Sequence, residues 1–351
     1  MTGRPPRAYL DWNATAPLRP EARAAMIAAM DLVGNPSSVH AEGRAAKALL
    51  ERARAQVAEG FGAQASDIVF TSGATEAAAL ALAGRDLSGS DIEHDAVRAW
   101  TRGDLPCGAD GAVAVADPAQ AALQAANSET GILQDLPPGL AVCDFTQAFG
   151  KIPLAFDWTG VEMGLISAHK IGGPKGIGAL VIRRGTDLAA QIRGGGQEMG
   201  RRSGTENLIG IAGFGAAVEA AQRDLADGVW DRVANLRKVL ESGLEAGGKE
   251  TIFVGNSVRR LPNTTCVIAP GWKGETQVMQ MDLAGFAVSA GSACSSGKMR
   301  ESAVLKAMGF APELARSALR VSLGPATTED EVNRFAEAWT RAYARARTRA
   351  A

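Results

Sequence analysis

The stretch Leu165-Ile166-Ser167-Ala168-His169-Lys170-Ile171-Gly172-Gly173-Pro174-Lys175-Gly176 is the part of this chain around which the rest is arranged. An apolar run leads into Ser-Ala-His-Lys, a Gly/Pro loop follows, and residues 179–182 have the length and branching of a strand. Lys170 is therefore predicted at the end of a strand, where a side chain can face a pocket. An amine there, beside the cation of Lys175, could form a Schiff base with a carbonyl. As an isolated motif, a lysine before a glycine loop is more often a solvated loop residue.

Asp144 strengthens the functional interpretation. It closes the apolar run 140–142, so its carboxylate is predicted at the carboxyl end of a strand, where α/β sheets bind their ligands. Pyridoxal phosphate needs a Schiff-base lysine and such an aspartate, which keeps the pyridine nitrogen protonated. Asp144-x-x-Gln147, followed by Ser167-Ala168-His169-Lys170 and Gly-Pro-Lys-Gly, resembles the cysteine desulfurases of the class V aminotransferase family. The resemblance runs from Tyr9 to about Glu331.

The resemblance implies an α/β fold of the fold-type I transferases that depend on pyridoxal 5'-phosphate. We expect a large domain with a mixed, mostly parallel sheet over residues 15–247. A smaller α+β domain is expected from residues 1–14 and 248–351. In the smaller domain the sequence predicts short strands over 251–254, 264–268, 287–289 and 317–323. Helices are predicted over 20–30, 41–59, 77–83, 207–225 and 228–244.

A second motif joins a buried strand at 68–71 to a helix through Ser72-Gly73-Ala74-Thr75-Glu76. A strand, a glycine turn and a helix start place free backbone N–H groups where a phosphate can bind. The Thr75 hydroxyl would add a donor beside the backbone at Ala74. An ordinary helix cap explains the same residue types equally well. The resemblance adds Ser167 and His169 as further ligands of the cofactor phosphate.

Two features depart from the family pattern. In Asn127-Ser128-Glu129-Thr130-Gly131, Ser128 replaces an asparagine that usually contacts the cofactor's ring hydroxyl. A hydroxyl offers one donor where an amide offers two, so this contact is lost, bridged by water or left to Gln147. The segment after Glu93-His94 is also shorter than in the family. The resemblance implies that His94 stacks on the cofactor ring and moves protons, although in isolation it would be a surface loop residue.

The glycine loop over 194–207 contains paired arginines and Thr205. Such a loop is generically an anion site or a flexible flap. The resemblance implies that Thr205 contacts the cofactor phosphate of the neighbouring subunit, which predicts a homodimer with shared active sites.

Two residues are expected to bind the substrate carboxylate. Arg320 is a charge within a strand pattern, and a planar guanidinium suits bidentate capture of a carboxylate. The alternative is an edge-strand arginine in solvent. Asn13 is an ordinary turn former by itself, and the resemblance gives it a share in the same contact. His40, in the loop that follows Gly34-Asn35-Pro36, is interpreted as structural.

Cys294 lies in Ser289-Ala290-Gly291-Ser292-Ala293-Cys294-Ser295-Ser296-Gly297, a run of small residues. A single cysteine is most often a core residue, but no bulky apolar residue flanks this one. Glycines on both sides allow the backbone to move. The resemblance makes Cys294 the catalytic cysteine. Cys143 and Cys266 lie in predicted strands and are expected in the core.

Composition excludes several classes of protein. The chain has 351 residues, 37 Lys and Arg against 38 Asp and Glu, and four cysteines without a C-x-x-C pair. No basic field favours nucleic acid, and no metal cluster or long apolar span is predicted. We therefore expect a soluble, cytoplasmic protein without membrane or direct nucleic-acid partners.

Taken with these residues, the resemblance implies a cysteine desulfurase that converts L-cysteine to L-alanine and transfers sulfur to Cys294 as a persulfide. A sulfur-acceptor protein, either an iron–sulfur scaffold or a transfer-RNA thiolation enzyme, is the expected partner. Two alternatives remain open. One is a lyase or transaminase of the same fold that does not use Cys294, for example one acting on selenocysteine. The other is a catalytically weakened scaffold or sulfur carrier.

Overall fold

The computed structural model describes residues 6–291 and 301–350 of the chain. Its larger sheet has five strands in the order β2-β6-β5-β4-β3. These strands are β2 Ser66–Thr71, β3 Ala122–Gln124, β4 Val142–Asp144, β5 Met163–Ser167 and β6 Gly178–Arg183. β3, β4 and β5 are parallel, and β6 runs antiparallel to both β5 and β2. Four of the five strands therefore run in one direction, which confirms the predicted mixed, mostly parallel sheet.

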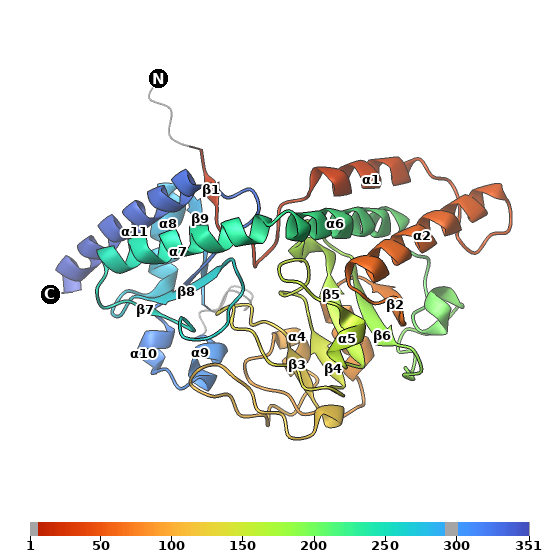
Figure 1. Cartoon of the computed structure of the whole chain (residues 1–351), viewed down its shortest axis with the longest axis horizontal. Coiled ribbons are helices and arrows are strands. Elements are labelled where there is room, and N and C mark those ends of the chain that lie inside the picture. The colour runs from red at the N-terminus through yellow and green to blue at the C-terminus, as the bar shows by residue number, and fades with distance from the viewer. Residues whose placement is uncertain (1–5, 292–300, 351) are drawn as a thin grey trace.

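Both faces of this sheet are buried under helices, so its strands are almost continuously apolar. Successive residues of β2 face opposite cores: Ile68 and Phe70 pack with α2 and α6, whereas Val69 packs with α3. α1, α2 and α6 lie side by side on the outer face (Figure 1). The helices of this part are α1 Pro20–Met30, α2 Ala41–Gly60, α3 Ala74–Leu82, α4 Asp95–Arg98, α5 Phe156–Thr159 and α6 Leu208–Ala226.

Three short 3₁₀ turns complete this part of the chain. They are η1 Pro118–Gln120, η2 Ala168–Lys170 and η3 Gln197–Gly200. The region between α3 and β3 contains little regular structure. Its helical turns are α4 and η1, and isolated bridges join Ser88 to Ala121, Ser90 to Leu105 and Cys107 to Val113. His40 caps α2, accepting the Gly43 N–H at 3.3 Å, which confirms its structural role.

The smaller sheet is antiparallel, in the order β10-β11-β8-β7. Its strands are β7 Ile252–Phe253, β8 Thr264–Ile268, β10 Ser289–Ala290 and β11 Ala318–Ser322. β1 Ala8–Tyr9 pairs with β9 Phe286–Ala287 beside it, so the amino-terminal segment lies against this part. The single strand expected over 287–289 is instead two short strands on either side of Val288.

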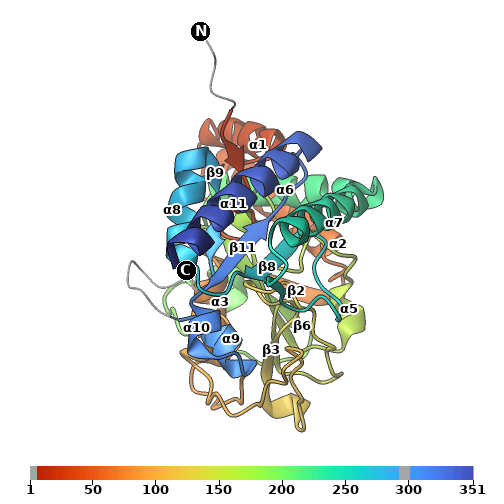
Figure 2. The same cartoon turned by 90° about the vertical axis from the view of Figure 1, so that its left-hand side faces the viewer.

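Helices α7 Val229–Gly247, α8 Gly274–Ala284, α9 Ala303–Ala307, α10 Pro312–Ala315 and α11 Glu329–Ala350 accompany the smaller sheet. Figure 2 shows α7 and α11 in front of β8 and β11. The buried side chains of α7 share one apolar cluster with Trp272, Trp339 and Tyr343. We therefore propose that the domain division falls near Gly228, between α6 and α7. None of the helices in residues 6–291 and 301–350 has the length and apolar character needed to cross a membrane.

Candidate active site

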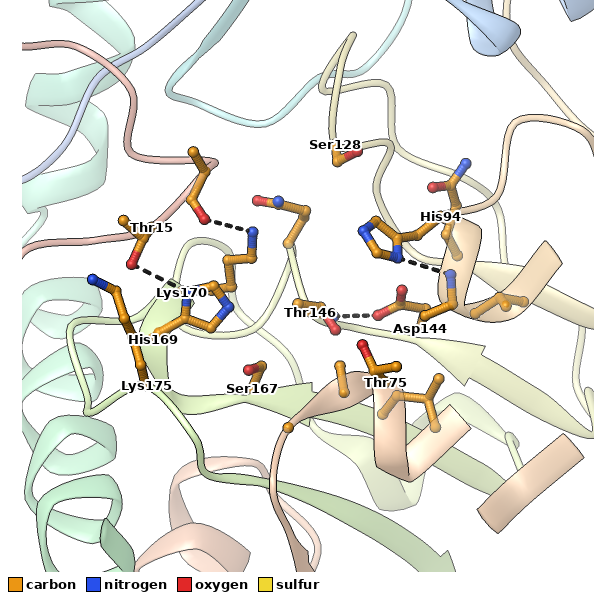
Figure 3. Close-up of a pocket in the computed structure, with 18 of the residues that line it drawn as sticks. Thr15, Thr75, His94, Ser128, Asp144, Thr146, Ser167, His169, Lys170 and Lys175 are labelled. Atoms are coloured by element: carbon orange, nitrogen blue, oxygen red, sulfur yellow. Dashed lines mark hydrogen bonds between the residues drawn. The ribbon is translucent and has the colours of Figure 1, made fainter. Parts of the chain in front are cut away.

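A cavity of about 610 Å³ opens at the carboxyl ends of β4 and β5 and beside the start of α3. Figure 3 shows Lys170 and His169 on one side of it and His94 and Asp144 on the other, with Ser167 and Thr75 between them. The convergence follows from topology, because parallel strands deliver the residues after them to one edge of the sheet. The predicted site residues that line the cavity are Ala74, Thr75, His94, Ser128, Asp144, Gln147, Ser167, His169 and Lys170.

Lys170 closes the turn η2, directly after the buried strand β5. Its Nζ donates hydrogen bonds to the backbone oxygens of Asn13 at 2.6 Å and Ala14 at 3.0 Å. Both acceptors belong to the segment that leads into α1. The amine is thus held at the cavity wall by neutral oxygens and can move into the cavity by rotation of its side chain.

The start of α3 forms a phosphate-sized cradle. Gly73 has φ +154°, and the first turn of α3 has no side-chain cap, so its backbone N–H groups remain available for a ligand. β6 approaches closely here: a Cβ on Gly178 would lie 2.8 Å from Gly73 Cα, so Gly178 is required sterically, whereas Gly73 is favoured by its φ of +154°. Ser167 and Thr75 lie beside this turn on the cavity lining.

The electrostatic character of this side of the cavity favours an anion. His169 bonds to the Thr15 hydroxyl through Nδ1 at 3.1 Å. Burial, followed by the nearby cations of Lys170, Lys175 and Lys151, lowers the pKa of His169 to about 4. His169 is therefore neutral at pH 7 and serves as a hydrogen-bonding group, while Lys170 and Lys175 of the cavity lining provide the positive charge.

The opposite side holds an acid and an imidazole. Asp144 is the last residue of β4, and its Oδ1 accepts the Thr146 N–H at 2.8 Å, which fixes the carboxylate. His94 caps α4 by accepting the Ala96 N–H at its Nδ1, at 3.1 Å, so the proton of the neutral ring is on Nε2. Glu93, which precedes His94, is buried. Its burial raises the pKa of its carboxyl well above the usual range, and the charge of Asp144 raises that pKa further.

Asn13 and Arg320 do not line the cavity but lie just behind it in one polar network. The Asn13 amide donates to Thr264 Oγ1 at 2.9 Å and to the Ser128 carbonyl at 3.3 Å. Arg320 is 2 % exposed, and its guanidinium pairs with Asp11 at 2.8 Å and with the Ser128 carbonyl at 3.1 Å. Arg320 is therefore a buried ion-pair partner, which excludes the solvated edge-strand alternative.

Thr205 lines a separate cavity of about 230 Å³, which shares Ser72 and Gly176 with the main one. The loop that carries it is anchored by Glu198, whose carboxylate accepts two bonds from Arg54, at 2.7 and 3.0 Å, and the Phe70 N–H at 2.9 Å. Cys294 lies outside the described residues. Cys143 and Cys266 are fully buried, as predicted, and burial raises the pKa of Cys266 to about 12.

The sequence analysis missed Thr15, Gln124 and Thr146 in the cavity lining, and it missed two buried residues behind the lining, Lys151 and Glu129. Lys151 is buried beside Gln147 and Asn13. The sequence feature that could have revealed it is a lysine four residues after Gln147 within an apolar stretch. Glu129 accepts the Ser302 hydroxyl at 2.5 Å, and burial is the main cause that raises its pKa to about 7. Its signal was a carboxylate next to Ser128, within a motif already assigned to the site.

The residues present fit pyridoxal phosphate. The uncapped turn of α3 and the cationic side suit its phosphate, Lys170 suits its aldehyde, and Asp144 suits its ring nitrogen. The two ends of the cavity therefore carry the charges that the two ends of this cofactor require.

Comparisons with known proteins agree with this geometry. The sequence profile of the family described as Aminotransferase class-V matches residues 8–103 and 107–335. A cysteine desulfurase from Cereibacter sphaeroides is 40 % identical over 369 residues, covering 94 % of each chain. The cysteine desulfurase IscS of Dictyoglomus turgidum is 36 % identical over 361 residues, covering 93 % of this chain and 91 % of that one. Among solved structures, a NifS-like protein from Rickettsia africae superposes with a TM-score of 0.86 at 31 % identity, covering 96 % of this chain and 99 % of the other.

Proposed function

This chain belongs to the aminotransferase class-V family and is a cysteine desulfurase that depends on pyridoxal phosphate, and we propose which of its residues convert L-cysteine to L-alanine. The observation that carries the proposal is the placement of Lys170 and Asp144 on opposite sides of one cavity, next to the uncapped start of α3. When bound, pyridoxal phosphate withdraws electrons from the bonds of the substrate's α-carbon.

The cofactor is held at both ends. The N–H groups of Ala74 and Thr75, with Ser167 and His169, bind its phosphate. Asp144 bonds to its ring nitrogen and His94 covers the ring. Gln147 donates a hydrogen bond to the ring hydroxyl. Ser128 is too short to make the contact that an asparagine would make from the same position. The Gln147 amide lines the cavity and is supported from behind, which favours this role.

Lys170 would hold the cofactor covalently through Nζ and would be released when the substrate amine takes its place. Its released Nζ then removes the proton from the substrate α-carbon, since it reaches the cavity from the Asn13 and Ala14 oxygens. The substrate carboxylate is bound near Asn13 and Arg320. Arg320 Nε is a buried donor for which the described part of the chain offers no partner, and this favours a ligand there.

Cys294 takes the sulfur. Its thiolate attacks the substrate sulfur, a new S–S bond forms, and the substrate C–S bond breaks with its electrons left on the carbon. Protonation of that carbon and return of a proton from Lys170 Nζ to the α-carbon give alanine, and Cys294 keeps the sulfur as a persulfide. A thiol acceptor on an iron–sulfur scaffold or a transfer-RNA thiolation enzyme removes it. Free thiols suit a reducing compartment, so we place the enzyme in the cytoplasm. We expect it to form a homodimer, in which Thr205 serves the site of the neighbouring subunit.

The function is tested by the products that the purified, yellow protein forms from L-cysteine. We expect alanine in an amount equal to the sulfur released when a thiol reductant is present. Lys170→Ala should abolish both products while leaving the thermal unfolding curve of the apoprotein unchanged. A yellow wild-type protein that forms no alanine would instead support the weakened scaffold.

A further inference from the structure

Lys151 is a buried lysine that the reaction as described above does not use. It follows β4 in the turn after Gln147, and it is 2 % exposed. Its Nζ donates to Gln147 Oε1 at 2.7 Å and to Asn13 Oδ1 at 3.0 Å. One amine therefore bonds to two amides, one of which lines the cavity while the other bonds to the Ser128 carbonyl.

These contacts fix the orientation of both amides. In both contacts Lys151 Nζ is the donor and the amide oxygen is the acceptor, so each amide turns its oxygen toward Lys151. The Gln147 Nε2 group then points the other way, where it donates to the Asn13 backbone oxygen at 3.0 Å. Asn13 Oδ1 accepts a second bond from Asn263 at 3.1 Å, which leaves Asn13 Nδ2 for Thr264 and Ser128. Without Lys151, the Gln147 amide would lose the donor that holds its oxygen, and the bond from Nε2 to the Asn13 backbone oxygen would be left to oppose a turn that presents an acceptor to the cavity.

Lys151 is poorly suited to a role in stability. Both of its acceptors are neutral oxygens, and the charge is out of water. Burial, followed by the cations of Lys170 and Arg320, lowers the pKa of Lys151 well below its usual range. Between that lowered pKa and the ordinary lysine pKa the unfolded chain binds more protons, so the buried amine reduces the free energy of unfolding at neutral pH. An apolar side chain of similar length would remove this cost.

We propose that Lys151 is a positioning residue that locks the Gln147 amide with its N–H group toward the cofactor. The inference rests on the proposed contact between Gln147 and the cofactor's ring hydroxyl. Lys151 itself does not touch the cofactor, because it lies behind Gln147 and outside the cavity lining.

The test compares Lys151→Met, Gln147→Ala and the double variant in the full chain. Pyridoxal phosphate is titrated into each apoprotein, its dissociation constant and visible absorption maximum are measured, and thermal unfolding of the apoprotein is followed separately. Lys151→Met should weaken cofactor binding roughly tenfold, about 1.4 kcal/mol, and shift the absorption in the same direction as Gln147→Ala. The double variant should be no worse than Gln147→Ala, while apo Lys151→Met should unfold at the wild-type temperature or above.

Three results would overturn this role. Additive losses in the double variant would mean that Lys151 does not act through Gln147. A lower unfolding temperature of apo Lys151→Met with unchanged cofactor affinity would make the lysine structural. Unchanged affinity and absorption in Gln147→Ala would refute the proposed contact of Gln147, and with it the premise. If Lys151→Met does not fold, Lys151→Gln serves instead. A glutamine at this position can either donate or accept, so it no longer dictates which way the Gln147 amide turns. Unchanged cofactor affinity in Lys151→Gln would contradict the proposal.

Discussion

At the residue scale, Asp144 has two separable tasks. Its Oδ1 holds the turn after β4 by accepting the Thr146 N–H at 2.8 Å, and its charge is proposed to keep the cofactor's ring nitrogen protonated. An asparagine keeps the first task, because its carbonyl oxygen can accept the same bond. It loses the second, because an amide carries no negative charge.

We therefore predict that Asp144→Asn folds normally but loses at least about 100-fold in kcat, roughly 2.7 kcal/mol in barrier. Alanine formation from cysteine measures the loss. The control is Asp157→Asn, since Asp157 also accepts a backbone N–H, from Ala65 at 2.8 Å, but lies outside the cavity lining. Asp157→Asn should fold normally for the same reason and keep its kcat. A kcat for Asp144→Asn within about threefold of the wild type would rule out the ring-nitrogen contact.

The sequence predicted Lys170, Asp144 and Thr75 as cavity residues because they follow strands or begin a helix, and local patterns locate both. Lys170 follows β5, Asp144 ends β4, and Thr75 opens α3. The support behind them was not predictable in this way. Lys151 contacts Asn13 across 138 positions of the chain, and such a contact depends on packing that no local pattern encodes. For the same reason the sequence did not reveal that Arg320 is paired with Asp11.

At the element scale, the loop over 194–207 is held in a strained conformation. Glu198 and Met199 have φ values of 48° and 59°, which non-glycine residues rarely adopt. The buried carboxylate of Glu198 offsets this strain by accepting two bonds from Arg54 and one from the Phe70 N–H. Arg201 and Arg202 add ion pairs to Asp67 and Glu76. These contacts within one subunit therefore fix the conformation of the loop over 194–207, and no partner subunit is needed for it.

Glu198→Gln should lower the free energy of unfolding by about 3 kcal/mol, because it leaves Arg54 buried without its main counter-charge. Urea unfolding measures this, and trypsin cleavage after Arg201 or Arg202 should become faster as the loop opens. The control is Glu250→Gln, which breaks the exposed pair between Glu250 and Arg347 and should leave the free energy of unfolding nearly unchanged. Equal effects of the two substitutions would show that Glu198 does not anchor the loop.

At the scale of the whole molecule, one subunit leaves Thr205 on its own small cavity rather than on the cofactor cavity. This placement agrees with the proposal that Thr205 serves the partner's cofactor. The two cavities meet at Ser72 and Gly176, so a second subunit docking over this edge can bring its loop to the start of α3.

A mixed dimer of Lys170→Ala and Thr205→Ala subunits, purified with two different tags, tests whether Thr205 acts in trans. The Thr205→Ala homodimer should bind pyridoxal phosphate roughly tenfold more weakly than the wild type, about 1.4 kcal/mol. In the mixed dimer, the subunit that keeps Lys170 receives an intact Thr205 from its partner. Its single site should therefore have wild-type affinity and half of the wild-type activity per dimer. Affinity as weak as that of the Thr205→Ala homodimer would place Thr205 in its own subunit's site.

The most direct test of the proposed desulfuration is alanine formation by Cys294→Ala, combined with mass spectrometry of the protein after exposure to L-cysteine. Binding of cysteine and removal of the α-proton depend on Lys170, so the variant should bind the cofactor and show a cysteine-dependent change in absorption. It should release no alanine, because no thiolate is present to take the sulfur. The wild type should gain about 32 Da, one sulfur atom, on the peptide that contains Cys294. Unimpaired alanine formation by Cys294→Ala, or the added sulfur on another cysteine, would contradict this mechanism and favour a lyase that does not use Cys294.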